Sequence, residues 1–484
     1  MNMTLTQLQT WLPQAVAVVG VSDTTLTAQT LIKAVRTDSR SVVAGDLFVA
    51  LKGEKFDGSA FLAQAQLQGA VAVLFEGQHP LSSELLQCLN GVSVPAFCVP
   101  NARAALGELA AQWRRQFALD LIGVTGSNGK TTVTQMMASV LRADASKPSL
   151  STQGNLNNDI GVPLTLFNLR SNHRRAVVEL GMNHPGEIEV LARFAQPTVG
   201  LVNNAQREHQ EHMATVEAVA LENGQVICAL PADGVAVFPA QDDYSGLWTR
   251  LAGKRKFMTF GFDAGDVQAH DIAWLAGAWQ FKLWTAEESL PCRLLIAGRH
   301  NVLNALAATA CALAAGMDLV QIVKGLESFE PVKGRSKSWE WQIGGHAFTL
   351  IDDTYNANPD SVRAAIDVLA ELPAPRMLVL GDMGEVGQKG PEFHAEVGTY
   401  AKERGIDTLL TLGDLCQHSS LAFEGAKHFK DMETLQQYVS MHIAAQKSLL
   451  IKGSRFMKME RLVETLRERT DSAQEQERES VHAA

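Results

Sequence analysis

The sequence predicts an α/β protein of three domains, each organised around a mostly parallel β-sheet. The chain has 484 residues, and at roughly 100–200 residues per domain this length suggests about three domains. Short apolar runs alternate with segments of helical periodicity, which is the pattern of strand–helix–strand units. Polar motifs follow several of the apolar runs, and in open α/β folds the carboxyl ends of the strands face the ligand.

We expect the first domain to span residues 1–118 and to be a small α/β unit. Three apolar runs, LFVAL, AVAVLF and AFCVP, are separated by turn residues and are typical of buried strands. An apolar-periodic segment over Ala102–Phe117 predicts a helix at the end of this domain.

The second domain, 119–330, should open on a strand at Leu119–Thr125, a glycine-bearing turn and a helix at Lys130–Ala143. Met136 and Met137 fall on the apolar face of this helix, so we interpret them as core residues and not as ligands. Further elements are predicted as strands at Ala176–Leu180, Val199–Asn203 and Val235–Phe238, alternating β-structure around Asp263–Leu290, and a helix at about Asn301–Ala315. This pattern is typical of a nucleotide-binding sheet with an added β region.

The third domain, 331–470, shows the clearest alternation of strands and helices, which predicts a parallel sheet of βαβ units. Its strands are predicted at Ala347–Asp352, Met377–Gly381, Thr408–Leu412 and Leu449–Lys452. Asn358 is placed to cap a helix whose first turn contains Pro359. The polar tail, 471–484, has the composition of a disordered segment.

Composition excludes several classes of protein. The net charge is -10 and there is no basic block, which disfavours nonspecific binding to nucleic acid or to anionic membranes. No apolar run approaches the ~18–20 residues that a membrane span needs. The six cysteines are scattered without CxxC spacing, as expected for reduced thiols. The first residues lack the pattern of a signal peptide, so we expect a cytoplasmic protein.

The strongest functional signal is IGVTGSNGKTT, which lies between an apolar strand and a periodic helix. Its glycines let the backbone turn tightly, so that N–H groups face phosphate oxygens. Lys130 would bring positive charge to the β- and γ-phosphates, and Thr131 would offer its hydroxyl to Mg²⁺. Val124 stands where the full GxxxxGK[ST] pattern has its first glycine, but the strand–turn–helix context still indicates a nucleotide site. The residues of this candidate ATP site are Gly126, Ser127, Asn128, Gly129, Lys130, Thr131 and Thr132.

Two further motifs follow apolar strands and offer ligands for a hard cation. Glu179, in VVELGMNHPGEI, lies at the end of its strand, where a carboxylate suits Mg²⁺. We interpret His209, in LVNNAQREHQEH, as a metal or phosphate ligand and His212 as a solvated neighbour. The HxxH spacing is also compatible with a zinc site, but no cysteine and no third histidine lie at a spacing that would complete the zinc ligands.

Polar residues near the second and third domain boundaries complete the candidate site. Asn301 and Asn304 lie one helical turn apart and can meet one ligand, or else Asn301 is simply a helix cap. In the third domain DDTYNANPDS, GDMGE and KGSR each follow a strand, so we expect them at one edge of the sheet. The GRS segment at its entrance supplies Arg335.

Together these residues resemble the Mur ligase family over nearly the whole chain. TGSNGKTT is similar to the short P-loop of that family. The segments GNLNNDIGVPLTL, ELGMNHPGEI and DDTYNANPDS resemble its MurF type, which joins D-alanyl-D-alanine (D-Ala-D-Ala) to a UDP-linked muramoyl tripeptide. TDSR and GDLFVALKGEKFDGSAF resemble the uridine-nucleotide region of the MurF and MurE types. The aspartate-tyrosine-alanine-histidine stretch and the DNPR motif expected of the MurE type are absent from the sequence.

The resemblance implies an N-terminal UDP-substrate domain, a central P-loop ATPase-like domain and a C-terminal Rossmann-like domain, with ATP and Mg²⁺ as cofactors. It implies catalytic roles for Lys130, Glu179 and His209, with the last two holding a second magnesium. Asn301 would meet adenine, while Arg335 and Asp353 would close over the nucleotide. The implied substrate-binding residues are Ser39, Arg40, Asn155 and Asn158.

The chain departs from the family pattern at one position. Many members carry a lysine, carbamylated to bridge the metal, a little after the histidine motif. In VEAVALENGQVI this chain places Asn223 there, and an asparagine cannot be carbamylated. Either the metal site is completed by water or a carboxylate, or the register of this comparison is shifted.

The implied substrates are UDP-MurNAc-tripeptide and D-Ala-D-Ala, joined through an acyl phosphate without a protein nucleophile. Charge neutralisation and positioning would supply most of the rate. The sequence does not identify the base that deprotonates the amine, for which His209 is one candidate. The alternatives are a MurE-type ligase that adds a single amino acid, a kinase, or a nucleotide-gated binding protein. These three alternatives and the MurF-type reaction differ in their products, so identifying the product distinguishes all four functions.

Overall fold

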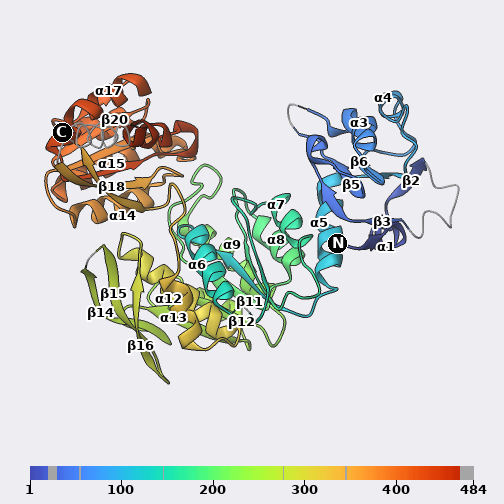
Figure 1. The fold of residues 1–484 in the computed structure, drawn as a ribbon, viewed down its shortest axis with the longest axis horizontal. Helices are drawn as coiled ribbons and strands as arrows, with labels where there is room; N and C mark the ends of the chain where they lie inside the picture. Colours follow the sequence, from blue (N-terminus) through green and yellow to red (C-terminus); the bar gives the residue numbers. More distant parts are fainter. Residues whose placement is uncertain (20–29, 54–55, 145, 276, 344–345, 469–484) are drawn as a thin grey trace, which may run out of the picture.

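The computed structural model describes residues 1–19, 30–53, 56–144, 146–275, 277–343 and 346–468. Three large β-sheets follow one another along the chain, and Figure 1 shows them as three separate bodies, coloured blue, green to yellow, and orange to red. Each sheet is mixed, with most of its strands parallel. The predicted α/β fold with three domains is therefore confirmed, while the residue boundaries of the domains stay a prediction.

The N-terminal body contains a five-stranded sheet in the order β2-β7-β6-β5-β4, in which only the β2–β7 pair is antiparallel. Its strands are β2 (Val16–Val19), β4 (Ala34–Arg36), β5 (Asp46–Ala50), β6 (Ala72–Glu76) and β7 (Ala96–Val99). A separate two-stranded sheet pairs β1 (Met3–Thr4) with β3 (Leu31–Ile32). Its helices are α1 (Leu5–Trp11), α3 (Leu62–Leu67), α4 (Ser83–Cys88) and α5 (Ala102–Arg114).

Helix α5 ends at Arg114, three residues before the predicted end at Phe117. The buried Arg114 guanidinium explains this end, because it donates hydrogen bonds to the carbonyl oxygens of Phe117, Leu119 and Ala195 at 2.7, 3.3 and 3.1 Å. Desolvation by burial lowers the pKa of this guanidinium. These bonds tie the end of α5 to the start of the central body.

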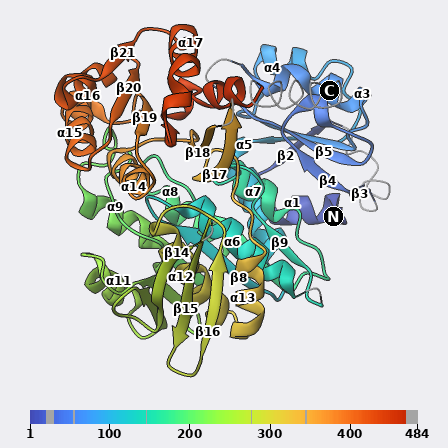
Figure 2. The same ribbon diagram turned by 60° about the vertical axis from the view of Figure 1, so that its left-hand side comes forward.

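The central body is built on a nine-stranded sheet in the order β16-β15-β14-β13-β12-β11-β8-β10-β9. Its strands are β8 (Asp120–Thr125), β9 (Ser149–Ser151), β10 (Arg175–Glu179), β11 (Val199–Val202), β12 (Val235–Pro239), β13 (Lys256–Gly261), β14 (Val267–Leu275), β15 (Ala278–Thr285) and β16 (Ser289–Leu294). The pairs from β9 to β14 are parallel, whereas β14, β15 and β16 pair in antiparallel fashion, which is the added β region that the sequence predicts. In both ribbon views this region lies at the end of the body away from the N-terminal sheet (Figure 1 and Figure 2).

Helices cover both faces of the central sheet. In β8, Ile122 and Val124 face a core shared with α6 (Lys130–Ala143), α12 (His300–Ala314) and α13 (Leu319–Glu327). Leu121 faces the opposite core, which is shared with α5, α7 (Gly161–Leu166) and α8 (Glu187–Ala195). Met136 and Met137 are fully buried in the first of these cores, so their predicted role as core residues is confirmed. The remaining helices are α9 (Val216–Asn223), α10 (Gln225–Cys228) and α11 (Ser245–Ala252).

The C-terminal body contains a six-stranded sheet in the order β17-β18-β22-β19-β20-β21. Its strands are β17 (Lys337–Ile343), β18 (His346–Asp353), β19 (Arg376–Gly381), β20 (Thr408–Leu412), β21 (Lys427–Phe429) and β22 (Ser448–Lys452). All pairs are parallel except β17–β18, and the sequence analysis did not predict β17. The main helices are α14 (Pro359–Ala370), α15 (Gly390–Glu403), α16 (Cys416–Phe423) and α17 (Met432–His442). Asn358 caps α14, as predicted, and Ser361 completes a capping box.

The predicted disordered tail, 471–484, lies outside the described residues. Within the described part of the chain, no helix combines the length and the apolar composition that crossing a membrane requires.

Close packing of α5 against α8 gives a test of how the first two bodies are joined. A Cβ atom added at Gly107 would lie 2.1 Å from Cζ of the buried Phe194 ring, so the two helices approach closely only because this residue is glycine. We expect Gly107→Ala to lower the free energy of unfolding by about 1–3 kcal/mol through overpacking, measured by thermal denaturation. Gly246→Ala in α11 is the control, because its added Cβ would lie 3.7 Å from the tip of Arg250. Equal stability of Gly107→Ala and the unmodified chain would contradict this account.

Candidate active site

The three central motifs follow neighbouring strands. Strand β8 pairs with β10 on one side and with β11 on the other, all in parallel. The P-loop follows β8, Glu179 is the last residue of β10, and the loop containing His209 follows β11. The chain leaves β8 toward β9 on one side of the sheet and leaves the neighbouring β11 toward β12 on the other side, and ligands bind in open α/β folds at such a point.

A cavity of about 1270 Å³ lies at this point, between the central and C-terminal bodies. It contains nearly all of the site residues predicted from the sequence: Ser127, Asn128, Gly129, Lys130, Thr131, Thr132, Asn155, Asn158, Glu179, His209, Asn301, Arg335 and Asp353. Gly126, Ser39 and Arg40 do not line it. Arg40 lies in the N-terminal body, where its exposed guanidinium is paired with Asp38 at 2.7 Å.

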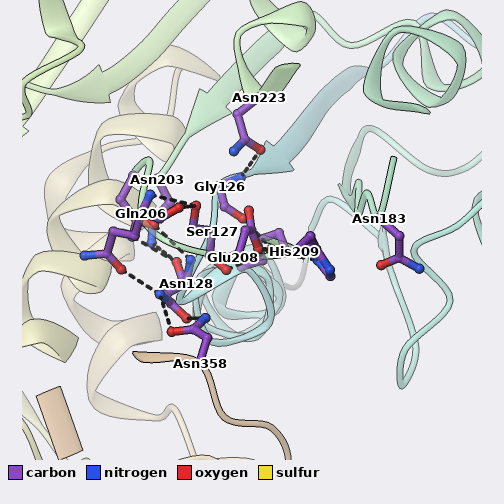
Figure 3. A network of polar contacts seen from close by, with 12 residues as sticks. Gly126, Ser127, Asn128, Asn183, Asn203, Gln206, Glu208, His209, Asn223 and Asn358 are labelled. Carbon is purple, nitrogen blue, oxygen red and sulfur yellow. Dashed lines mark hydrogen bonds and ion pairs between the residues drawn. The ribbon is translucent and has the colours of Figure 1, made fainter. Parts of the chain in front are cut away.

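The P-loop turn depends on glycine at two positions. Gly126 and Gly129 have φ values of +128° and +81°, in the region that side chains disfavour. A Cβ atom at Gly126 would lie 2.9 Å from Cβ of Asn203, and one at Gly129 would lie 2.5 Å from Oδ1 of Asn304. The loop backbone is therefore packed directly against neighbouring asparagines, as Figure 3 shows for Asn203.

Asn223 supports the same loop from the end of α9. Its Oδ1 accepts the backbone N–H of Gly126 at 2.9 Å (Figure 3). The side chain is buried, and its Nδ2 has no hydrogen-bond partner among the described residues. Asn223, the residue that departs from the family pattern, therefore lies against the P-loop backbone. Its neutral amide group holds Gly126 at the start of the P-loop turn.

The Lys130 ammonium lies over the P-loop and contacts a buried carboxylate. Its Nζ donates to the carbonyl oxygens of Gly126 and Ser127, the latter at 3.0 Å, and lies 3.3 Å from Oε2 of Glu208. Glu208 is 5% exposed, and its Oε1 has no hydrogen-bond partner among the described residues. Sequence reasoning named no role for Glu208, although its position next to His209 was a signal.

Glu179 is also buried at the P-loop and has a free oxygen. Its Oε1 accepts hydrogen bonds from Oγ1 of Thr131 at 3.1 Å and from Nδ2 of Asn157 at 2.8 Å. Its Oε2 is buried and has no partner in the described part of the chain. Oxygen donors of this kind are the ligands that a hard cation prefers. The sequence analysis predicted substrate-binding roles for Asn155 and Asn158, both of which are exposed. It missed Asn157, the asparagine that contacts Glu179.

Asn301 takes part in a chain of amide hydrogen bonds. Its Nδ2 donates to Ala297 O at 2.7 Å, and its Oδ1 accepts from Nδ2 of Asn304 at 2.8 Å. Oδ1 of Asn304 in turn accepts from Nδ2 of Asn203 at 2.9 Å. Helix α12 begins at His300 after an N-cap at Arg299, so the alternative that Asn301 is the helix cap is wrong.

Two groups of contacts join the C-terminal body to the P-loop region. Nδ2 of Asn358 donates to Oδ1 of Asn128 at 2.9 Å, next to the predicted phosphate site (Figure 3). Arg207 pairs with Asp360 at 2.6 Å and with Glu396 at 2.8 Å, and these two carboxylates raise the pKa of its guanidinium. The cap of α14 and the start of its first turn therefore face the nucleotide site.

His209 lies between carboxylates of two bodies. Its Nδ1 is 2.6 Å from Oε2 of Glu385 in the C-terminal body, and its Nε2 is 3.7 Å from Oε2 of Glu208. Contact with His209 lowers the pKa of the Glu385 carboxyl group. His212 is exposed, in agreement with its interpretation as a solvated neighbour, and its ring lies 4.3 Å from the His184 ring.

Arg335 and Asp353 enter the cavity from the C-terminal body. Oδ2 of Asp353 pairs with Nζ of Lys452 at 2.6 Å, and Lys452 is 4% exposed. Oδ1 of Asp353 accepts the backbone N–H of Ser336 at 3.1 Å. The Arg335 guanidinium stacks over the Tyr355 ring at 4.1 Å and has no described salt-bridge partner. These cations and the P-loop lysine give the cavity the charge that polyphosphate binding and phosphoryl transfer require.

Comparison with known proteins identifies the family. The model of the Mur ligase family catalytic domain matches residues 31–114, that of the Mur ligase middle domain matches 124–312, and that of the Mur ligase glutamate ligase domain matches 339–455. The chain is 39% identical to UDP-N-acetylmuramoyl-tripeptide–D-alanyl-D-alanine ligase of Escherichia coli (strain K12), covering 91% of this chain and 95% of the relative. It is 32% identical to the enzyme of the same name in Bacillus subtilis (strain 168), covering 90% and 94%.

Solved structures agree with these matches. MurF from Acinetobacter baumannii is 36% identical with a TM-score of 0.87, covering 97% of this chain and 99% of that one. MurF ligase from Thermotoga maritima in complex with ADP is 25% identical with a TM-score of 0.79, covering 91% and 98%. The family models and the relatives together cover most of the chain, so this protein belongs to the Mur ligase family.

Proposed function

We propose that this chain joins D-alanyl-D-alanine to UDP-N-acetylmuramoyl-tripeptide with cleavage of ATP to ADP and phosphate, a step of peptidoglycan precursor synthesis. The names of its relatives support this reaction. The observation that carries the proposal is the single cavity that brings the P-loop and Glu179 together with Arg335 and Asp353. Such a site has phosphate-binding groups on two bodies that can enclose a nucleotide.

The reaction proceeds in two steps. A carboxylate oxygen of the tripeptide attacks the γ-phosphorus in line, the bond to the β-phosphate oxygen breaks, and ADP leaves an acyl phosphate. The neutral amine of D-alanyl-D-alanine then attacks the acyl carbon, loses a proton and expels phosphate. Lys130 stabilises the negative charge that develops on the phosphoryl oxygens, and the remaining rate comes from positioning the reactants.

The acidic side chains fit a magnesium ion. Glu179 and Glu208 each have a buried oxygen with no hydrogen-bond partner among the described residues. We assign Thr131, Glu179 and His209 as the residues that hold magnesium, which when bound neutralises charge on the phosphates. Glu208 extends this set, because its buried free oxygen adds a carboxylate donor beside Lys130 in a chain that has Asn223 at the position of the family's carbamylated lysine.

The other predicted residues receive roles by their position. Asn301 faces the cavity from α12 and would contact adenine, while Arg335 and Asp353 would contact the nucleotide from the C-terminal body. Asn155 and Asn158 line the same cavity and would meet the reacting end of the UDP-peptide. Ser39 and Arg40, in the N-terminal body, would hold its uridine nucleotide. This arrangement needs all three bodies for one reaction.

The P-loop lysine is the first test. Lys130→Ala removes the ammonium group that the phosphates require and should lower ligation by more than about 1,000-fold, or about 4 kcal/mol. Circular dichroism should show an unchanged fold, because Lys130 lines the cavity and not the core. Lys254→Ala, at an exposed lysine of the same body, is the matched control and should keep full turnover. Ligation by Lys130→Ala within tenfold of the unmodified chain would rule out the P-loop assignment.

The second test concerns the C-terminal body. Asp353→Asn removes the charge that pairs with the nearly buried Lys452, so the cavity wall reorganises. We expect ADP affinity to fall about tenfold, which is about 1.4 kcal/mol, as measured by isothermal titration calorimetry. The control is Asp271→Asn, whose pair with Lys282 is mostly exposed and contributes little. Unchanged affinity and turnover in Asp353→Asn would place the nucleotide away from this residue.

The third test is the substrate. ATP turnover should require UDP-N-acetylmuramoyl-tripeptide and D-alanyl-D-alanine together, because the first provides the phosphate acceptor and the second consumes the acyl phosphate. Mass spectrometry should show a UDP-peptide that gains one dipeptide and no phosphoryl group. Diaminopimelate, lysine or D-glutamate should not replace the dipeptide. Addition of a single amino acid to a shorter UDP-peptide would instead show a MurE-type ligase, and a phosphorylated product would show a kinase.

A further inference from the structure

A polar contact across two bodies lies beside the proposed magnesium site. His209 belongs to the loop after β11 in the central body, and Glu385 belongs to the loop after β19 in the C-terminal body. The His209 Nδ1 and the Glu385 Oε2 are 2.6 Å apart. The same loops also meet through their backbones, since Glu211 N–H donates to Glu385 O at 3.3 Å.

Both residues of this contact have an unusual backbone conformation. The φ values of His209 and Glu385 are +47° and +58°, in the left-handed region that residues with a Cβ rarely adopt. Such conformations cost free energy, persist only where the surroundings fix them, and gather at functional sites. The backbones of both loops are therefore held in the shape that brings these two side chains together.

The contact determines which nitrogen of His209 is left for a ligand. Because Nδ1 faces Glu385, only Nε2 remains, and it lies 3.7 Å from the Glu208 Oε2. The other Glu208 oxygen is buried without a partner in the described part of the chain, and the Lys130 ammonium is 3.3 Å from the first. Nε2 is therefore directed toward the group of charges beside the P-loop.

The loop that carries Glu385 is fixed within the C-terminal body. The N–H of Gly384 donates to Oγ of Ser454 at 2.5 Å, and the N–H of Met383 donates to Nε2 of the buried His394 at 3.0 Å. Ser454 N–H also donates to Asp382 O at 3.0 Å. Glu385 therefore moves with the C-terminal body and reaches His209 only when the two bodies are in contact.

We propose that Glu385 is a positioning residue for the metal ligand His209, supplied by a different body of the chain. Its carboxylate lies 2.6 Å from Nδ1, where the ring N–H is not aligned with it in this structure, and a small rotation of the ring lets the carboxylate accept the Nδ1 proton and hold the neutral tautomer whose Nε2 lone pair faces the cation. Carboxylate partners of this kind orient metal-bound histidines in many proteins. The inference rests on the magnesium role of His209 in the proposed function.

This arrangement makes metal binding depend on domain contact. If the C-terminal body is needed to orient His209, a bound cation must in turn favour the contact between the two bodies, because coupling between two equilibria is reciprocal. A role limited to holding the bodies together predicts no such link. Arg207 provides the comparison, since it joins the same bodies through Asp360 and Glu396 and neither carboxylate contacts His209.

The experiment uses the full chain with ADP and Mn²⁺, whose free ion is counted by electron paramagnetic resonance. We expect Glu385→Ala to weaken Mn²⁺ binding by about 10- to 100-fold. Glu385→Gln should retain most of the affinity, because the amide oxygen still accepts the Nδ1 proton. Glu396→Gln, which weakens the other contact between the bodies but leaves the Arg207–Asp360 pair, should lower Mn²⁺ affinity much less than Glu385→Ala does.

The tautomer of His209 gives a second readout that a purely structural role would not change. In ¹⁵N NMR spectra without metal, the unmodified chain should show His209 with its proton on Nδ1, assigned by the loss of its signals in His209→Gln. Glu385→Ala should show a mixture of both tautomers, while Glu396→Gln should show Nδ1 alone.

Each outcome decides the matter. Unchanged Mn²⁺ affinity and an unchanged tautomer in Glu385→Ala would overturn the inference and leave the proposed reaction intact. Equal loss of affinity in Glu396→Gln and Glu385→Ala would overturn it in favour of general domain contact. If His209→Gln binds Mn²⁺ as tightly as the unmodified chain, the metal role of His209 fails and the inference with it, and ligation by the unmodified chain then reports on the proposed reaction separately.

Discussion

The close approach of the P-loop backbone to its neighbours is the constraint on which the site depends. Gly126 and Gly129 leave no room for a Cβ, because Asn203 and Asn304 already occupy the space. Asn223 adds a hydrogen bond to the same turn. The loop is therefore held before any ligand arrives, and its N–H groups need little reorganisation to meet phosphate oxygens, which is the condition for effective electrostatic stabilisation.

The charged side chains around the P-loop are fixed in position by the same close packing. Glu179 and Glu208 are buried next to it, and a buried carboxylate is costly unless it is paired or bonded to a metal. Lys130 compensates part of this charge through Glu208, while Thr131 and Asn157 both donate to the same oxygen of Glu179, Oε1. The two carboxylate oxygens that remain without partners are ligands of the kind that the proposed magnesium ion prefers.

The sequence predicts elements well where periodicity is local. The helix at Lys130–Ala143 has the bounds observed for α6, and the four predicted strands of the C-terminal body differ from the observed ones by at most one residue at each end. Helix α5 ends earlier than its periodicity suggests because Arg114 bonds to carbonyls of another body. Strand β17 was missed because the sequence analysis looked for parallel strands that alternate with helices. This strand instead pairs in antiparallel fashion with β18 at the edge of the sheet.

The same distinction separates the site residues that the sequence predicts from those it misses. Residues at or just after the end of a strand, such as Lys130, Glu179 and Asp353, were found because strand ends converge in a parallel sheet. Glu208 and Asn157 gain their roles through side-chain contacts made after folding; the position of Glu208 next to His209 was its one signal in the sequence, and no spacing marks Asn157. The contact of His209 with Glu385 is harder still to predict from the sequence, because it joins loops of two different bodies and depends on how these bodies pack together. Nucleotide binding and the placing of the C-terminal body must therefore be linked, since Asn128 of the P-loop and His209 each contact that body directly.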